Sequence, residues 1–269
     1  FYLSDGGDLP GRDLRYREEA RMRGDGELWI EPPIMEYVSA KLYALVGDAD
    51  LRVPRALAIS FWLLGAIGLI WLTGGWLSES GVLAAVGVYL LLPYGVYISR
   101  SFQPEALMTF MTILSLGALM RWSERNSWGL ALLSGLFIGL AIFVKQVMIF
   151  PLGLALACAM LGTAGSVRKA IASPQRWVMG LLAILPITLY NVWGLWIDGF
   201  LGQQYQGRFN FGAWLTAGFY IRWLRETDAV FGILLAAAAL IGISLLRGTW
   251  RAIWLGYFAG FVLYGFALP

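Results

Sequence analysis

The chain has 269 residues, of which 59% are hydrophobic and only 14% are charged. Soluble domains carry about 25% charged residues, so this composition excludes an ordinary soluble protein. Thirteen Trp and twelve Tyr fit a chain that crosses bilayer interfaces many times, because amphipathic rings settle there. The net charge of +3 is small and its positive residues are scattered, so we expect no nucleic-acid partner. The lack of His and the single Cys158 exclude a histidine base and a disulfide within the chain.

Both ends of the chain are unusual for a complete membrane protein. The sequence opens on Phe1 rather than Met, and it stops at Pro269 directly after the apolar run IWLGYFAGFVLYGFALP. We therefore interpret it as an internal fragment of a longer protein.

Apolar windows of roughly 17–25 residues predict membrane-spanning helices. Eight follow the polar segment 1–53: 54–74, 80–99, 104–120, 129–144, 147–164, 177–197, 229–246 and 251–268. The window 129–144 is short for a span. The expected fold is all-α: a polytopic transmembrane helical bundle at 54–269 with about eight helices and an outer loop at 198–228. The first-loop segment 1–53 would lie outside the cytoplasm.

The run PPIMEYVSAKLYALVG within the first polar segment has apolar residues at helical spacing. Glu36, Ser39 and Lys41 form the polar face of the predicted helix, and Gly47 suits its end. About eleven residues are too few to span a bilayer, so we expect an amphipathic helix lying in the membrane surface.

The orientation follows from Lys and Arg in the short loops. One set of loops is denser in basic residues and is predicted to be cytoplasmic: Arg121, Arg125, Arg168, Lys169, Arg176, Arg247 and Arg251. Residues 1–53, 100–104, 145–146 and 198–228 then share the outer side, although seven basic residues in 1–53 complicate the assignment.

Charged residues between apolar windows are costly and need an explanation. In YISRSFQPEALMTFM, Pro104 suits a first helical residue, and Glu105 would lie beside the free N–H groups of that helix start. Arg100 could pair with Glu105 or bind a phosphate through its fork of donors. A salt bridge that merely anchors the helix end is the alternative.

Two further residues have both a functional and a structural interpretation. Glu31 lies in LWIEPP, where Pro32 favours extended geometry and would hold the carboxylate at a defined place for function. The structural interpretation is that its negative charge stabilises the N-terminus of the following helix. Lys145 interrupts GLFIGLAIFVKQVMIFPLGLAL, where it either extends to the interface or supplies a cation for an anionic ligand. Asp5, Asp8 and Asp13 lie among glycines and a proline, which favours ordinary turns.

The order of these motifs resembles a known family. EPPIMEYVSAKLYALVG, LRVPRALAISFWLLGAIGLIWL, VYISRSFQPEALMTFMTILSLGALMRWSER and GLFIGLAIFVKQVMIFPLGLAL are similar to segments of bacterial membrane glycosyltransferases. These belong to the dolichyl-phosphate-mannose protein mannosyltransferase-like family of the GT-C fold class, which includes the aminoarabinose transferases of lipid A. The resemblance covers about residues 1–165.

The resemblance implies a sugar donor linked to a polyprenyl phosphate and used on the extracytoplasmic face of the inner (plasma) membrane. In this family the catalytic aspartate lies upstream of an aromatic pair that resembles Phe1-Tyr2. The resemblance therefore implies that this aspartate is absent from the present sequence, together with the first membrane span. The positions that match the family's motifs are Glu31, Arg52, Arg100, Glu105 and Lys145. Many relatives carry Asp at the position of Glu105.

Glycosyl transfer from a lipid phosphate needs a base for the acceptor hydroxyl and a group that neutralises the departing phosphate. The resemblance assigns Arg100 and Lys145 to the phosphate, with Tyr97 and Gln103 beside them in substrate binding. Glu31 and Glu105 are the expected catalytic carboxylates. Glu31 is also a candidate ligand for a divalent cation, for which oxygen ligands favour Mg²⁺ or Mn²⁺, and no other cofactor is expected.

Two other classes of protein stay open from the sequence. A transporter or flippase of lipid-linked substrates would place its charges near the midplane on broken helices, whereas here they gather at one face. A non-catalytic membrane assembly partner could keep the fold and lose the acids. Neither the sugar nor the acceptor, which is a lipid, a glycan or a protein, follows from the sequence.

Overall fold

A computed structural model describes residues 31–47, 50–197, 199, 201–202, 211–230 and 232–267. Within these ranges every regular element is a helix. This confirms the expected all-α bundle. The predictions for Phe1-Tyr2, Asp5, Asp8 and Asp13 lie outside the described residues.

The amphipathic segment forms helix α2 (Ile34–Val46), and it ends at Gly47 in a left-handed conformation with φ of 80°. A residue without a side chain adopts this conformation easily. Tyr37, Leu45 and Val46 are exposed, which fits a helix at the surface. The predicted polar face is wrong at Ser39, because this residue is buried.

The centre of the molecule is a row of long helices that pack side by side. Helix α3 (Arg52–Thr73) packs on α6 (Glu105–Arg125), α6 on α7 (Trp128–Val144), and α7 on α10 (Pro174–Val192). Helix α8 (Ile149–Ala164) packs against α13 (Gly248–Ala267). Apolar residues of these helices form the main core, in which Trp122 and Ile138 are fully buried.

Two of these contacts depend on glycine. A Cβ atom at Gly139 would collide with the backbone carbonyl of Leu182 on α10, and one at Gly260 with that of Phe150 on α8. Within a membrane the hydrophobic effect does not drive helices together, so their association relies on close packing. Small residues allow two helix backbones to approach closely. The close α7–α10 and α8–α13 contacts therefore follow from these two positions.

The predicted span 80–99 is broken rather than continuous. Helix α4 (Glu79–Leu91) and helix α5 (Pro93–Arg100) meet at an angle of 58°. Leu92 between them is extended, with φ of −58° and ψ of 122°, because a residue before proline avoids the helical region. This bend turns α5 away from the line of α4 and leads the chain back to the start of α6.

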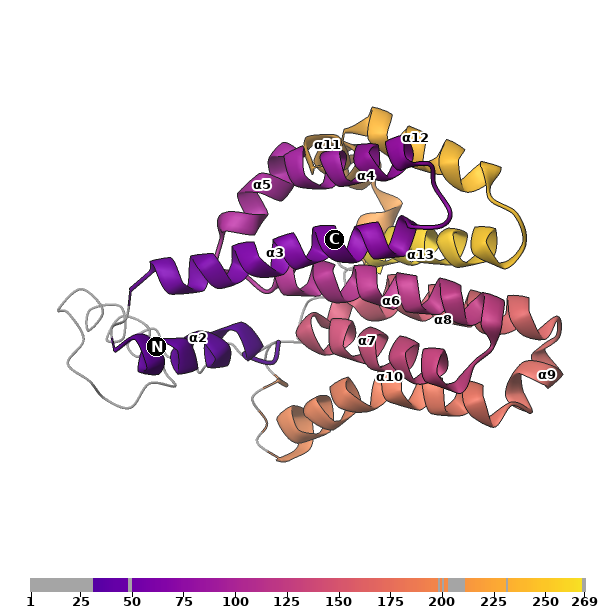
Figure 1. Ribbon diagram of the computed structural model, residues 1–269, viewed down its shortest axis with the longest axis horizontal. Coiled ribbons are helices and arrows are strands. Elements are labelled where there is room, and N and C mark those ends of the chain that lie inside the picture. The colour runs from indigo at the N-terminus through magenta and orange to yellow at the C-terminus, as the bar shows by residue number, and fades with distance from the viewer. Residues whose placement is uncertain are drawn as a thin grey trace.

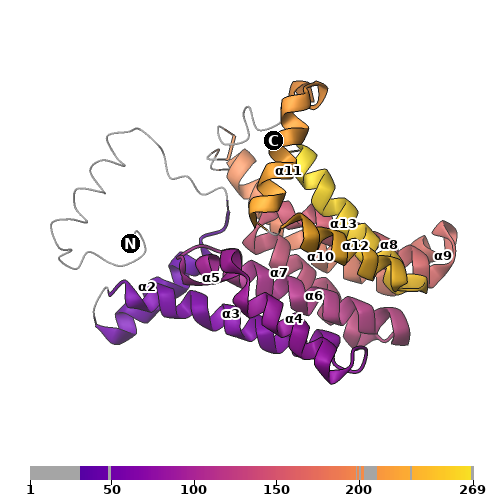
Figure 2. The same ribbon diagram turned by 90° about the horizontal axis from the view of Figure 1, so that it is seen from above.

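The rest of the chain consists of short helices and one further bent pair. The 3₁₀ turn η1 (Gln146–Met148) leads into α8, and the short helix α9 (Val167–Ile171) precedes α10. After the π turn η2 (Trp193–Ile197) come the 3₁₀ turn η3 (Phe211–Leu215), α11 (Ala217–Val230) and α12 (Ile233–Leu245). Much of the predicted loop 198–228 is therefore helical. Figure 2 shows α3, α4 and α5 along one side of the molecule and α11 on the other.

By length and composition, four described helices can each cross a membrane: Arg52–Thr73, Glu105–Arg125, Gln146–Ala164 and Pro174–Ile197. The number rises to six if each bent pair is one span, the second pair being α11 with α12 at 88°. All eight predicted windows are thus helical, but fewer than eight meet the criteria for a span within the described residues.

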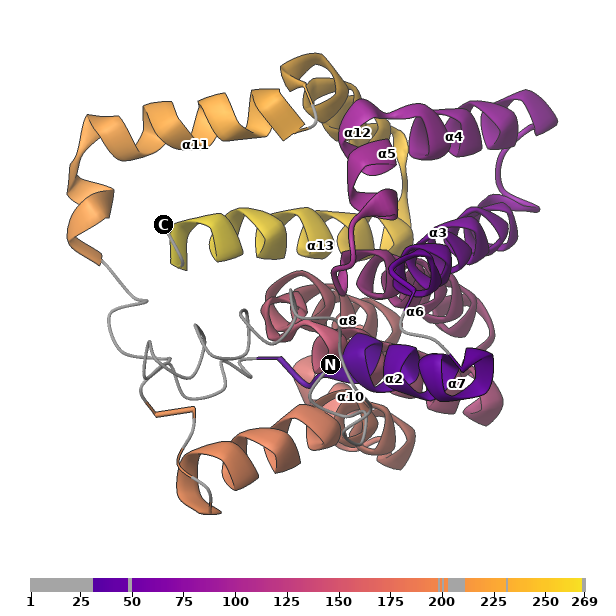
Figure 3. The same cartoon turned by 90° about the vertical axis from the view of Figure 1, so that its left-hand side faces the viewer.

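The long helices alternate in direction, so their connections gather at two opposite ends. Figure 1 shows α2 at one end and α9 at the other. The basic connections at 121–128, 165–176 and 246–251 lie at the α9 end, because α6, α8 and α12 lead into them. Figure 3 looks onto the α2 end, where α6 and α8 begin and α7 ends.

Candidate active site

An ion pair at the α2 end joins two of the predicted site residues. The Lys145 Nζ atom donates a hydrogen bond to Oε1 of Glu105. The side chains are 22% and 24% exposed, so both charges are largely removed from solvent. An ion pair in such a place is strong only if its geometry is fixed by the surrounding structure.

The helix ends fix both partners. Glu105 is the first residue of α6, directly after Pro104, and lies where the unpaired N–H groups of a helix start favour a negative charge. Lys145 follows the last residue of α7 and is extended, with φ of −147° and ψ of 106°. This break separates α7 from η1 and directs the lysine side chain away from the helix.

A small apolar cluster holds these helix ends and α2 together. Its buried members are Met35, Ala58, Ala106, Leu107 and Val144, which come from α2, α3, α6 and α7. Three of them are neighbours in sequence of Glu105 or Lys145. Packing of apolar side chains therefore sets the positions of the two charges, and it ties the surface helix to them.

Glu31, just before α2, acts on the same lysine. Burial disfavours the charged form of Lys145, but the hydrogen bond and charge of Glu105, together with the charge of Glu31, raise the pKa of the ammonium above its ordinary value. The lysine is thus a fixed cation at neutral pH. Of the predicted site residues, the structure brings Glu31, Glu105 and Lys145 together.

The second carboxylate oxygen of Glu105 has a different environment. Oε2 is buried and has no hydrogen-bond partner in the part of the chain that the structure describes. A buried polar atom without a partner is rare in proteins and needs a specific explanation. Glu105 also lines a large cavity, so a ligand bound there would lie beside this carboxylate.

That cavity has a volume of about 680 Å³ and walls that are mostly apolar. On α6 its lining residues run from Glu105 through Met108, Thr112 and Ile113 to Leu116. Eleven residues of helix correspond to about 16 Å of length, so the cavity extends from the ion pair towards the opposite end of the bundle. Trp62 and Leu72 of α3 and Trp254 and Tyr257 of α13 line it as well.

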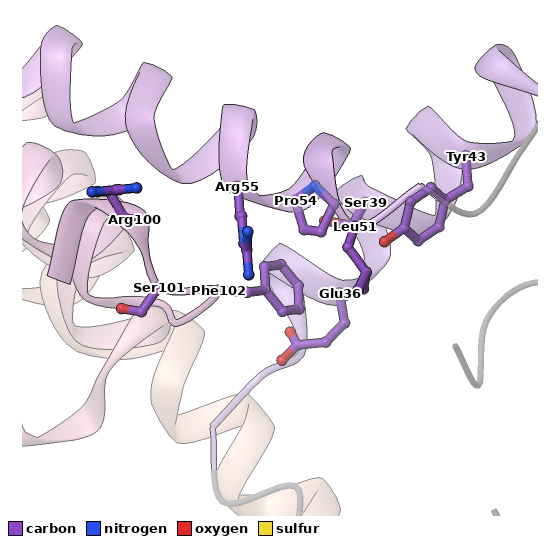
Figure 4. A pocket seen from close by; sticks show the side chains of 9 residues that line it. All are labelled: Glu36, Ser39, Tyr43, Leu51, Pro54, Arg55, Arg100, Ser101 and Phe102. Carbon is purple, nitrogen blue, oxygen red and sulfur yellow. The ribbon is translucent and has the colours of Figure 1, made fainter. Parts of the chain in front are cut away.

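Arg100, the last residue of α5, is separate from this pair. One of the two sequence-based interpretations of Arg100, a pair with Glu105, is wrong, since the partner of Glu105 is Lys145 and Arg100 has no ion pair among the described residues. Arg100 is exposed and lines a second, smaller pocket with Arg55, Glu36 and Ser39, shown in Figure 4. The two pockets have no lining residue in common.

Tyr97 and Gln103 line neither pocket. Tyr97, on α5, is 70% exposed, and Gln103 is exposed in the connection between α5 and α6. Arg52 begins α3 and forms an exposed ion pair with Asp50. The assignment of Tyr97 and Gln103 to substrate binding stays a prediction.

The carboxylates of the described segments do not by themselves form a cation site. No group of three or more Asp, Glu, His or Cys side chains lies close enough together in these segments to hold a metal ion. One oxygen of Glu105 is already bonded to an ammonium group, which would repel a cation. A metal bound by Glu31 would need further oxygen ligands from elsewhere in the protein.

The sequence pattern of the family described as dolichyl-phosphate-mannose-protein mannosyltransferase matches residues 30–193. The match covers more than half of the chain. The chain belongs to this family. It is therefore a membrane glycosyltransferase of the GT-C type, from a family that uses lipid-linked sugar donors. No curated protein and no solved structure matches the chain.

The matched region contains the ion pair and also three residues that sequence reasoning did not place in a site. Arg55 and Ser39 line the smaller pocket, and Thr112 lines the cavity with its hydroxyl buried and without a partner. The sequence could have indicated Arg55, since a second arginine at the start of an apolar helix is unusual. The burial of Ser39 and Thr112 depends on which helices pack together, which the spacing alone does not determine.

Proposed function

We propose that this protein transfers a glycosyl group from a polyprenyl-phosphate donor to an acceptor hydroxyl on the extracytoplasmic face of the inner membrane. One observation carries the proposal: a fixed ammonium–carboxylate pair lies at one end of a long apolar cavity within the bundle. A polyprenyl-phosphate sugar fits this arrangement, because its anionic head matches the charged end of the cavity and its apolar chain matches the apolar walls.

In this reaction the acceptor oxygen forms a bond to the anomeric carbon, and the bond from that carbon to the phosphate oxygen breaks. The bonding electrons leave with the polyprenyl phosphate, whose negative charge rises. Lys145 supplies a positive charge where this charge develops, which stabilises the transition state. Glu105 holds the ammonium in position and offers Oε2 to a hydroxyl hydrogen of the donor sugar.

The acceptor hydroxyl loses its proton to a carboxylate. Glu31 lies close enough to Lys145 for their charges to interact, so it adjoins the place at which the phosphate departs. We assign Glu31 to positioning the acceptor or taking its proton, together with the aspartate that the family places in its first outer loop.

A flippase is the alternative that shares a lipid-linked substrate. Such proteins place charges near the membrane midplane on broken helices. Here Glu105 and Lys145 lie at helix ends, and the cavity beyond them is apolar. This distribution favours an enzyme that holds its substrate at one surface.

The test is a transfer assay on the intact protein with a panel of polyprenyl-phosphate sugars and, as the contrasting class, nucleotide sugars. We expect sugar transfer from one polyprenyl-phosphate donor with release of free polyprenyl phosphate, and none from nucleotide sugars. Use of a nucleotide sugar, or translocation of the lipid-linked sugar with no transfer, would contradict the proposal.

Replacement of Glu31 by Gln is expected to lower the transfer rate at least tenfold, because the amide cannot accept a proton and no longer acts on Lys145. The midpoint of thermal unfolding should change little, since Glu31 is partly exposed. Glu124→Gln, an exposed change on α6 at the opposite end, is the matched control. A normal rate for Glu31→Gln would show that this acid only supports the start of α2.

Cysteine labelling checks the proposed orientation. In a Cys158→Ala background, Gln103→Cys should react with a membrane-impermeant reagent added outside intact cells, whereas Lys169→Cys should react only after the membrane is opened. The basis is the gathering of seven basic residues in the connections at the α9 end. The opposite labelling pattern would place the active site on the cytoplasmic face.

A further inference from the structure

The second pocket is a site in its own right. Its volume is about 270 Å³, and it lies between α2, the start of α3 and the connection that follows α5. Figure 4 shows the Arg55 side chain extending from α3 towards Phe102, with Glu36 of α2 nearby. Three segments far apart in sequence thus contribute polar groups to one concave surface.

The charge of this pocket is positive. It contains two guanidinium groups, of Arg55 and Arg100, and one carboxylate, of Glu36. Neither guanidinium has an ion pair or a hydrogen bond within the described part of the chain. Among the described residues, these two arginines and Glu36 give the pocket a net charge of +1, and the guanidinium N–H donors have no acceptor.

A buried hydroxyl in the pocket wall points to a ligand independently of these charges. Ser39 is only 4% exposed, and its Oγ atom has no hydrogen-bond partner among the described residues. A serine within a helix commonly bonds to the carbonyl one turn earlier, yet this one does not. The wall of the pocket therefore holds a buried hydroxyl that no acceptor of the described residues satisfies.

We propose that Arg55, Arg100 and Ser39 form a binding site for an oxyanion, a phosphate or carboxylate group, that is separate from the donor phosphate at Lys145. Arginine binds such groups through parallel N–H donors, and a serine hydroxyl adds a third. Glu36 then accepts a hydrogen bond from a hydroxyl group of the same ligand. Because α2 lies at the surface and the pocket opens beside it, the anion belongs to a headgroup at the membrane surface.

The oxyanion can belong to the headgroup of the acceptor or to the headgroup of a lipid in the surrounding bilayer. The first rests on the glycosyl transfer proposed above. Binding of the anion itself does not, so it can be tested without turnover.

The first experiment measures binding of three short-chain lipids, dioctanoyl phosphatidic acid, phosphatidylglycerol and phosphatidylcholine, to the intact protein in detergent by native mass spectrometry. We expect the two anionic lipids to bind and the zwitterionic one to bind at least tenfold more weakly. Arg55→Ala and Arg100→Ala should each weaken phosphatidic acid binding at least tenfold, and Ser39→Ala severalfold. Lys145→Met should retain it.

Arg125→Ala is the matched control, because Arg125 is also exposed at a helix end but lies at the α9 end of α6. Equal binding to the wild type and both arginine variants would overturn the proposal. So would an equal loss in Arg125→Ala, since the effect would then reflect overall charge. Unfolding midpoints of all variants show whether each one is folded.

The second experiment separates the two sources through the effect of phosphatidic acid on transfer. Competition against the acceptor, but not against the donor, would assign the site to the acceptor headgroup. A raised unfolding midpoint without competition would assign it to a bilayer lipid. Competition against the donor alone would overturn the separation of the two anion sites.

Discussion

Replacement of Lys145 by Met is expected to lower transfer at least a hundredfold and to destabilise the protein. The variant loses the cation that faces the donor phosphate, and it leaves Glu105 as a largely buried carboxylate without its partner. An exposed ion pair contributes about 0–1 kcal/mol, whereas loss of one partner of a buried pair costs about 3–5 kcal/mol. With the partners 22% and 24% exposed, we expect a loss of about 1–3 kcal/mol.

The measurement is a double-mutant cycle on the unfolding midpoint and the donor KM. Glu105→Gln alone should also destabilise the protein, but the Glu105→Gln/Lys145→Met double variant should lose less than the sum of the two single changes. Arg125→Met is the matched control, since it removes an exposed cation that has no ion pair among the described residues and should leave the midpoint unchanged. Additive losses of stability would show that the two charges do not interact, and a normal donor KM for Lys145→Met would reduce the pair to an anchor of two helix ends.

The observed partner of Glu105 is Lys145, whereas the sequence offered Arg100, five residues away, as one possible partner. Lys145 is forty residues away, but helix lengths could have revealed the contact. Helices α6 and α7 have 21 and 17 residues and a two-residue connection, so they form an antiparallel hairpin. The start of α6 and the end of α7 then lie at nearly the same level.

The positions of the helices were predictable because apolar windows and surface-helix periodicity depend on local sequence alone. The α2 helix and its end at Gly47 follow from such a pattern. The break at Leu92 was also predictable in principle, since Pro93 restricts the residue before it. The predicted continuous span at 80–99 neglected this proline, because hydropathy windows do not register a bend.

Other features depend on packing that no local pattern encodes. Ser39 belongs to the polar residues of α2, yet it is buried, because it follows Met35 by one turn and shares the face that packs into the bundle. Arg55 and Arg100 meet in one pocket only because α5 bends back towards α3. The long cavity likewise exists only where several helices stay apart along the length of α6.

Replacement of Thr112 by Phe tests whether this cavity holds the apolar chain of the donor. Thr112 is buried on α6, and its hydroxyl has no partner. A phenyl ring at this position would project into the cavity of about 680 Å³. We expect the donor KM to rise at least tenfold. The unfolding midpoint should change little, because the ring fills existing space rather than displacing packed side chains.

Two controls separate a filled cavity from other effects of the substitution. Thr112→Val removes the hydroxyl without adding volume, so it should keep the donor KM and raise stability by about 1 kcal/mol, since an unpaired buried group is lost. Leu63→Phe places the same ring on α3 at a side chain that is 52% exposed. It should leave both quantities unchanged.

Chain length gives the sharpest form of this test. Thr112 lies seven residues along α6 from Glu105, which is about 10 Å from the proposed phosphate position. A donor whose prenyl chain is too short to reach this depth should bind Thr112→Phe and the wild type equally, whereas a long-chain donor should discriminate between them. An equal rise in KM for the short-chain and the long-chain donor would mean that the ring disturbs the ion pair. A normal KM for both would place the lipid chain outside the cavity, along the outer surface of the bundle.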